Sequence, residues 1–249
     1  MKRTVWILLG FILFALLSVT IYMYFYSKPS AFLNDDELLK KINSTHTTAK
    51  AVRIQDTISV DDFHYFVPFQ SKTGGHGTSY WEWKKNKWQV LMIDTVGQPL
   101  LWKVEGKTPS TYRIVWNLHP DDKVNSSHYY LTRERGYFIT GDQENYFPKV
   151  EMVKKITHGK QSYGVVKLSK EWVSVIDSLI KMESVKQTNF YDHFTLSRFM
   201  YLGWTPYDRS GNEVIIEHSV NGNGYHVDDI DLEFVRYMDG IELEQSGGK

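Results

Sequence analysis

The first segment of the chain is an apolar run without any charged residue, from Thr4 to Tyr26. At about 1.5 Å of rise per residue, a helix over this run crosses a hydrocarbon core of roughly 30 Å. Lys2 and Arg3 precede the run, and positive charge favours the cytoplasmic side of a membrane. The pattern therefore predicts one transmembrane helix, embedded in the lipid bilayer through residues 4–26, with the N-terminus inside the cell and the body outside.

A cleaved signal peptide is the alternative interpretation of this segment. Such peptides carry an apolar region of about 7–15 residues and then a small-x-small cleavage site. Here the run is longer and ends in Tyr22, Tyr24, Phe25 and Tyr26, and the nearest small-x-small triplet begins with Pro29. Aromatic residues of this kind are typical of membrane interfaces. The sequence thus favours a retained anchor.

After the anchor, the hydrophobic period changes from helical to alternating. A juxtamembrane helix is expected over residues 34–42, because Asn34 can cap it and Glu37 completes a capping box. A polar linker, 43–50, follows. Alternating or β-prone runs then predict strands over residues 51–60, 63–69, 80–84, 88–93, 100–104, 112–118, 128–132, 137–140, 163–168, 213–220 and 232–238.

Turn and cap residues indicate how these elements are connected. Lys85-Asn86-Lys87 predicts a hairpin within Tyr80–Ile93, and Glu134-Arg135-Gly136 predicts a second hairpin that joins 128–132 to 137–140. Pro68 lacks an N–H, so we expect it at a sheet edge or strand end. Ser169 caps a helix that runs to about Glu183, whereas residues 190–202 fit helix and strand equally.

The order of elements predicts an α+β fold, mainly antiparallel β-sheet with one or two helices, behind the N-terminal transmembrane helix. We divide the chain into residues 1–27, the cytoplasmic end and anchor, and 28–50, the juxtamembrane helix and linker. Residues 51–168 form a β-rich extracytoplasmic domain. Residues 169–249, a helix and a C-terminal hairpin region, are expected to pack on that same domain, and the tail from Gln245 is expected to be disordered.

Composition limits the function classes. Without Lys2 and Arg3, the body carries 27 basic and 29 acidic residues, so as a whole it has no electrostatic preference for nucleic acid or for anionic lipid surfaces. The chain has no cysteine, which excludes disulfides, lipoprotein attachment and thiol-nucleophile chemistry. A secreted animal domain of this size usually carries disulfides, so a bacterial envelope is the expected location.

No catalytic motif satisfies both order and context. Ser178-Leu179-Ile180-Lys181, Ser219-Val220-Asn221 and Lys72-Thr73-Gly74 have the letters of penicillin-binding enzymes, yet the Lys-Thr-Gly triplet should come last and here comes first. Ser178 also lies inside a predicted helix instead of opening one. No cofactor is predicted.

Two clusters contain metal-ligand residue types. One is His119, Asp121 and Asp122, with His128 nearby, and the other is His226, Asp228 and Asp229, near Asp231. Pro-Asp-Asp and Asn-Gly-Asn-Gly are also ordinary turn sequences, in which carboxylates cap free N–H groups. We therefore regard both clusters as candidates of low weight.

Tryptophan is abundant in the body. Indole faces stack on sugar rings, and they also fill β cores and protein interfaces. Most tryptophans are expected in the core, and Trp81, Trp102, Trp116 and Trp204 are candidates for an exposed binding strip. The sequence favours a non-enzymatic extracytoplasmic module that binds an envelope protein or a cell-wall glycan, and the alternative is an envelope hydrolase with unassigned carboxylates.

Overall fold

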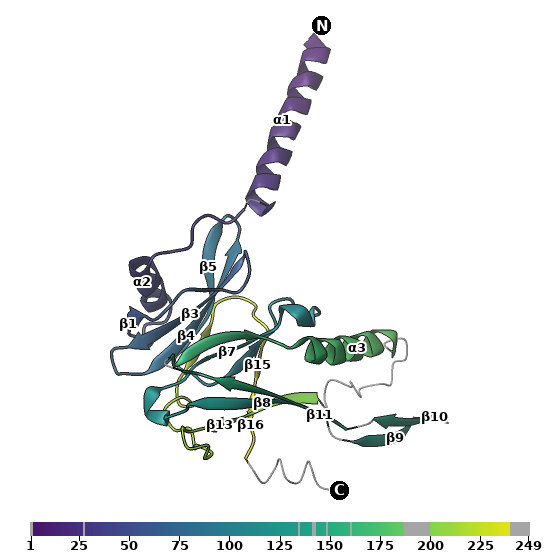
Figure 1. Ribbon diagram of the computed structural model, residues 1–249. Helices are drawn as coiled ribbons and strands as arrows, with labels where there is room; N and C mark the ends of the chain where they lie inside the picture. The colour runs from purple at the N-terminus through teal and green to yellow at the C-terminus, as the bar shows by residue number, and fades with distance from the viewer. Residues whose placement is uncertain are drawn as a thin grey trace.

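The computed structural model describes residues 2–26, 28–133, 135–140, 143–147, 149–159, 161–186 and 200–239. These residues form an α+β fold with three α-helices and mostly antiparallel strands, which confirms the predicted class of the body (Figure 1). The helices are α1 (Lys2–Tyr26), α2 (Asp35–Thr45) and α3 (Lys170–Lys186).

Three sheets make up most of the body, and a separate two-stranded hairpin extends from it (Figure 1). Sheet A has the order β1 (Ala51–Ile54), β3 (His64–Ser71), β4 (His76–Lys84), β5 (Lys87–Asp94) and β14 (Gly224–His226), and β2 (Ile58–Ser59) also pairs with β3. Sheet B has the order β12 (Tyr163–Lys167), β7 (Arg113–Asn117), β6 (Leu100–Trp102) and β15 (Leu232–Phe234). Sheet C has the order β11 (Val150–Thr157), β8 (Ser126–Arg133), β13 (Met200–Tyr207) and β16 (Arg236–Tyr237). The hairpin pairs β9 (Gly136–Thr140) with β10 (Gln143–Phe147), and η1 (Pro109–Thr111) and η2 (Pro120–Asp122) are short 3-10 turns.

The sheets are stacked, so the middle layers are apolar on both faces. Leu38 and Ile42 of α2 cover one face of sheet A, and Tyr80 on its other face packs against sheet B. In β7, Val115 faces sheet A while Ile114 and Trp116 face sheet C, which explains why every residue of β7 is buried. Trp172 of α3 completes the core between sheets B and C.

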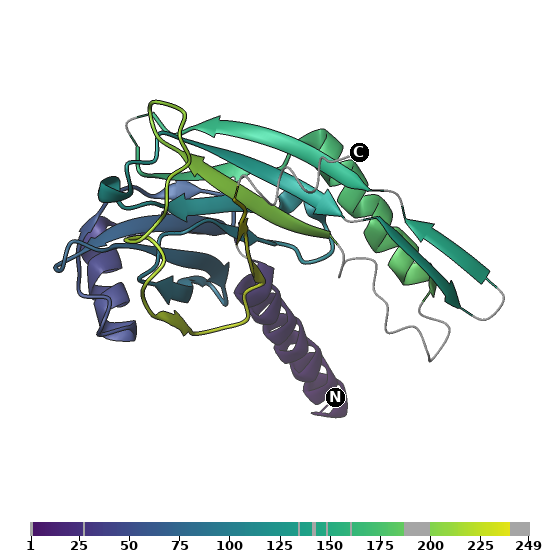
Figure 2. The same cartoon turned by 90° about the horizontal axis from the view of Figure 1, so that it is seen from below.

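The segment 4–26 forms the continuous helix α1, which projects away from the body (Figures 1 and 2). Its described side chains between Trp6 and Val19 are exposed, with Trp6 and Phe11 about three-quarters accessible at 74% and 75%. In the part of the chain that the structure describes, no helix meets the combined length and apolarity criteria for a membrane span.

Local sequence signals predicted several elements correctly. Asn34 and Glu37 form the predicted capping box at the start of α2. The hairpin of β4 and β5 turns at Lys85 and Asn86, which both adopt positive φ (53° and 60°). Ser169 accepts a hydrogen bond from the backbone N–H of Trp172 at the start of α3.

Four features of the predicted secondary structure are wrong. The predicted hairpin over 128–140 does not form, because β8 pairs with β11 and β13 while β9 pairs with β10. Residues 213–220 are not a strand: Glu213 makes one isolated bridge to Tyr207, and the rest is irregular. The predicted strand 232–238 is divided into β15 of sheet B and β16 of sheet C. The linker 43–50 is partly helical, because α2 continues to Thr45.

Pro68 lies inside sheet A, not at its edge. Its carbonyl accepts a hydrogen bond from the backbone N–H of Gln55, so its nitrogen also points to the side of β1 and β2. The pairing on that side is interrupted between β1 and β2, where no acceptor needs a proline N–H. Most of the ambiguous segment 190–202 and the tail from Gln245 lie outside the described residues.

Candidate functional site

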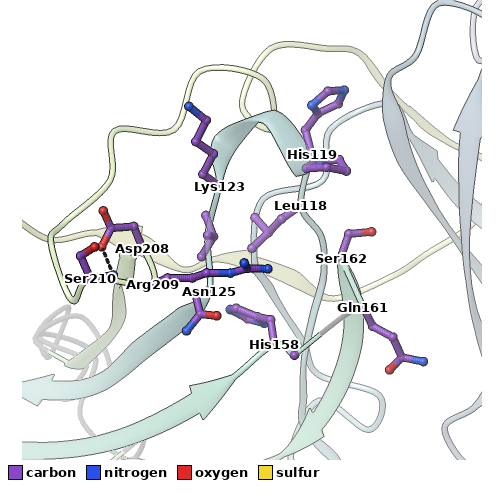
Figure 3. A pocket seen from close by; sticks show the side chains of 13 residues that line it. Leu118, His119, Lys123, Asn125, His158, Gln161, Ser162, Asp208, Arg209 and Ser210 are labelled. Atoms are coloured by element: carbon purple, nitrogen blue, oxygen red, sulfur yellow. Dashed lines mark hydrogen bonds between the residues drawn. The ribbon is translucent and has the colours of Figure 1, made fainter.

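A cleft with a volume of about 630 Å³ opens at one end of the β-sheets (Figure 3). Four separate loops meet there: the η2 turn, the start of β8, the β11–β12 connection and the turn after β13. We call it the histidine cleft. Its lining residues are Leu118, His119, Pro120, Lys123, Val124, Asn125, His158, Gly159, Gln161, Ser162, Asp208, Arg209 and Ser210.

Two cations in the histidine cleft have no acidic partner among the described residues. Arg209 extends between Leu118 and His158, and Lys123 lies at the rim (Figure 3). No ion pair involves either side chain in this part of the chain. The nearby carboxylate of Asp208 instead accepts hydrogen bonds from the backbone N–H groups of Ser210 and Asn212, at 2.8 and 2.9 Å. Positive charge is therefore available to an anionic ligand.

His158 forms part of the cleft wall and is held in its neutral form. Its Nε2 lies 2.7 Å from the hydroxyl of buried Ser127, and its ring meets the edge of Trp116 at 5.1 Å between centroids. Burial lowers the pKa of His158 to about 4. Its Nδ1 and the indole N–H of Trp116 are buried without a hydrogen-bond partner in the described structure. Ser127 is fully buried, so this serine–histidine contact does not present a nucleophile to the cleft.

A buried polar network fixes the floor of the histidine cleft. The amide of Asn117 donates to Gln55 Oε1 and to the carbonyl of Gly77, both at 2.7 Å. Its oxygen lies 3.2 Å from Nδ1 of His76 and also accepts from Ser162 at 3.4 Å. Because Asn117 belongs to sheet B and Gly77 to sheet A, the network locks the two sheets together. Ser162 is thereby positioned where the network reaches the cleft.

The first metal candidate cluster is a structural turn. Asp122 is buried and accepts hydrogen bonds from the backbone N–H groups of Glu217 and His218, at 3.1 and 2.9 Å, and from the Ser219 hydroxyl. His119 accepts from the N–H of Asp121 through Nδ1. The Asp122 carboxylate thus holds the irregular segment 217–219 against the η2 turn, and His128 lies elsewhere, against the ring of Tyr207.

The second candidate cluster also consists of locally bonded side chains. Asp228 makes a 2.7 Å ion pair with Lys84 and accepts from the N–H of Asp229, and His226 is exposed on β14. Asp231 lies 3.9 Å from Lys103. Over the described ranges, no group of three or more His, Asp or Glu side chains is arranged to hold a metal ion.

The four candidate binding tryptophans are core residues. Trp81, Trp102, Trp116 and Trp204 have exposed fractions of 0–4%, and they belong to the three large hydrophobic clusters. They form no exposed strip, because sheets A, B and C are stacked and leave no free indole face on these strands.

A second cleft, of about 470 Å³, contains the acidic side chains Glu82, Asp229 and Asp231. Glu82 is flanked by Lys84 at 3.9 Å and His64 at 4.0 Å, and Asp231 by Lys103. Glu82 and Asp231 thus lie beside cations, so the described lining of this cleft does not contain the two unpaired acids that a carboxylate hydrolase uses. The geometry gives no specific support to the hydrolase alternative.

Apart from His119, which was a candidate metal ligand, sequence reasoning missed the residues that line the histidine cleft. Lys123, His158 and Arg209 come from three loops that are far apart in the chain, and no periodicity or motif links them. The only local signal is the turn chemistry of Asp208–Asn212, which places Arg209 at a loop tip.

The comparisons with known proteins identify no relative. No protein-family model matches the chain, and no curated protein or solved structure is significantly similar to it.

Proposed function

We propose that this chain is a single-pass membrane protein of a bacterial envelope, with its body outside the cytoplasm. In this proposal the histidine cleft of the body binds an acidic group of a cell-wall polymer or of an envelope protein. The anchor is residues 4–26 and the N-terminus is cytoplasmic. The uncharged run, Lys2 and Arg3 before it, and the exposed side chains of α1 support this part of the proposal.

The observation that carries the binding role is the pair of cations Arg209 and Lys123 in the histidine cleft, which form no ion pair with any described residue. Arginine binds carboxylates and phosphates through a rigid fork of N–H donors. Asn125 adds an amide group whose side chain makes no hydrogen bond within the described structure, and Gln161 adds a second amide, which is hydrogen-bonded to Tyr163. Such a mixture of cations and amides suits a polymer or peptide that carries both acidic and neutral polar groups.

The geometry favours binding over catalysis. The His158 ring is oriented by a buried serine, and the one carboxylate lining the cleft, Asp208, is occupied by its own turn. Neither residue is placed to act as a nucleophile or to share a proton with a second acid. The proposed site therefore holds a ligand and leaves it unchanged.

Binding is tested with the full chain in lipid nanodiscs. The probes are a poly(glycerol phosphate), a polyglutamate and a neutral glycan, and the titration is followed by calorimetry at low and high salt. We expect the two polyanions to bind and the neutral glycan not to bind. Losing a charge-assisted hydrogen bond costs about 1.5–3 kcal/mol, so Arg209→Gln should weaken binding roughly tenfold or more.

Lys107→Gln is the matched control, because Lys107 is an exposed lysine outside the histidine cleft. Equal loss in Arg209→Gln and Lys107→Gln, or equal binding of the neutral glycan, would reject the cleft as the site. The two polyanions distinguish a phosphate ligand from a carboxylate ligand. The anchor is tested separately: a soluble product that starts near Phe32 in the intact mass would disprove retention.

A further inference from the structure

The segment that follows α1 is fixed to one end of sheet A. Trp88 at the start of β5 donates its indole N–H to the carbonyl of Ser30, at 3.1 Å. The ring of Phe32 stacks on Tyr65 at 3.9 Å between centroids and meets the edge of Trp88 at 4.9 Å. The chain leaving α1 is therefore held by specific contacts and is not a free linker.

This attachment limits the distance between α1 and sheet A. Only four residue steps separate Tyr26 from Ser30, and an extended chain covers at most about 3.6 Å per residue. The end of α1 thus lies within about 14 Å of Ser30. In both views the base of α1 adjoins the end of sheet A where β4 turns into β5 (Figures 1 and 2).

Basic and aromatic side chains gather at that end of the sheet. The turn Lys84–Lys87, hereafter the lysine turn, carries three lysines, and Lys28 precedes the docked segment. Lys84 pairs with Asp228, and the charge of Lys85 also acts on that carboxylate, whereas Lys28 and Lys87 form no ion pair within the described ranges. The backbone of Trp83 donates to the carbonyl of Phe63, whose ring is 46% exposed.

The backbone of the lysine turn is unusual for its sequence. Both central residues have positive φ, 53° at Lys85 and 60° at Asn86. Such two-residue turns prefer Asn-Gly or Asp-Gly, and a lysine is disfavoured in the left-handed region. Position 85 therefore carries a lysine against the local backbone preference.

We propose that the lysine turn and Phe63 rest on anionic lipid headgroups beside the anchor. This inference builds on the proposed membrane anchoring of α1. Lysines are attracted to the negative surface of anionic lipids, and aromatic side chains favour the membrane interface. The acidic residues of this end are partly engaged: Asp61 accepts from His64 at 2.9 Å, and Glu82 and Asp228 lie near Lys84. Asp62 and Asp229 are the exposed opposing charges among the described residues of this end.

The contact would orient the histidine cleft away from the membrane. The β3–β4 turn, residues 72–75, lies at the opposite end of β4, and nine residues of strand place it about 27 Å from the lysine turn. His119 of the cleft lies 3.1 Å from the carbonyl of Gly74 in that distal turn. A body resting on the lysine turn therefore presents the cleft toward the cell wall.

The absence of cysteine provides a direct test. The full chain is reconstituted with a single thiol, either Asp62→Cys at the lysine-turn end or Thr73→Cys at the distal end, and a fluorophore is attached. Vesicles contain a nitroxide headgroup lipid in phosphatidylcholine, with or without phosphatidylglycerol. We expect strong quenching at position 62 and little at position 73, with more quenching at 62 when phosphatidylglycerol is present and less at high salt.

Removing Lys85 and Lys87 should distinguish quenching that depends on lysine charge from quenching caused only by the nearness of the anchor. Lys85→Asn suits the left-handed turn position better than lysine, so with Lys87→Gln it removes two charges without disfavouring the hairpin. Each lysine near an anionic surface contributes about fivefold to contact, so the double variant should abolish the phosphatidylglycerol-dependent part of the quenching at position 62. Lys72→Gln, at the distal end, should change nothing.

Each outcome bears on one proposal. Equal quenching at positions 62 and 73, or quenching at 62 that survives the double variant unchanged, would overturn the headgroup contact. Alkaline extraction of the same vesicles tests the anchor independently. Protein that remains in the membrane without quenching at 62 refutes the headgroup contact alone, whereas protein that washes out refutes the anchoring on which it rests.

Discussion

Protonation of His158 should destabilise the folded body in a defined pH range. Burial lowers its pKa from 6.5 to about 4, so the unfolded chain binds a proton more readily than the folded one. The stability that the body has with His158 neutral is therefore fully present above pH 6.5. It is lost progressively as the pH falls toward 4, because the unfolded chain takes up the proton first. At 1.36 kcal/mol per pKa unit, the total is about 3 kcal/mol, of which about 2 kcal/mol is lost between pH 7 and pH 5.

Urea unfolding of the fragment 28–249, followed by tryptophan fluorescence, measures this effect. The fragment retains Ser30 and Phe32, so the contacts of the docked segment are preserved. With a slope of 2–3 kcal/mol/M, the midpoint should fall by roughly 0.7–1 M between pH 7 and pH 5 because of His158 alone. Burial also lowers the pKa of His76 and His128, so the wild-type protein loses further stability in the same direction.

The variant His158→Gln isolates the contribution of His158 to the pH dependence of stability. It keeps a polar group near Ser127 but removes the titrating ring, so its free energy of unfolding should fall about 2 kcal/mol less than that of the wild type over this range. His218→Gln, at an exposed position, is the matched control and should follow the wild type. If His158→Gln and the wild type lose the same stability between pH 7 and pH 5, or if the NMR titration of His158 has a midpoint near 6.5, the reasoning is refuted.

Three further outcomes are expected for the same fragment. Trp88→Ala should cost roughly 3–5 kcal/mol in urea unfolding, because the indole is 8% exposed and anchors Ser30, whereas Trp83→Ala, at a half-buried position, should cost less; equal costs would contradict the difference in burial. Asp122→Ala should cost roughly 2–4 kcal/mol, because it leaves buried donors unsatisfied, and an unchanged midpoint would show that segment 217–219 does not depend on it. Millimolar calcium or zinc should not raise the melting temperature; a rise of several degrees that Asp121→Asn or Asp229→Asn abolishes would establish a metal site, since a ligand at a hundredfold excess over Kd contributes about 2.7 kcal/mol.

Elements set by neighbouring residues could be predicted from the sequence. The capping box of Asn34 and Glu37 acts within one helical turn, and Ser169 caps α3 in the same way. The β4–β5 hairpin likewise depends on a two-residue turn between two β-prone runs. In each case the stabilising contacts lie within a few residues, so the local pattern contains the necessary information.

Pairings between distant segments could not be predicted. Strand β8 selects β11 and β13 instead of its neighbour β9, because those pairings bury Tyr129 and Leu131 between sheets B and C. Sheet A illustrates the same limit: the consecutive residues Tyr80 and Trp81 point to opposite faces of β4, and both are buried because α2 and sheet B cover those two faces. Stacking of layers is a property of the whole chain and leaves no periodic signal in one strand.

The candidate site was hidden for a related reason. Lys123 ends the η2 turn with a positive φ of 55°, His158 follows β11, and Arg209 lies in the turn after β13. Each residue alone is an ordinary loop residue, and only the three-dimensional fold brings them to one cleft. Buried Asn117 is the exception in principle, since a polar residue in an otherwise apolar strand signals a network, although it does not reveal the partners.

The segment that follows α1 and the histidine cleft lie near opposite ends of strand β4. This arrangement gives the two proposals a common physical basis. A single attachment at residue 28 would let the body swing about the anchor, so the histidine cleft would sample all directions. The contacts of Phe32 restrict the segment between α1 and sheet A. A second contact at the lysine turn would fix the remaining tilt of the body relative to the membrane. Because β4 is nine residues long, the two proposals together would place the cleft about 27 Å from the headgroups. A ligand fixed in the cell wall would then meet a cleft that is already oriented, which reduces the entropy lost on binding.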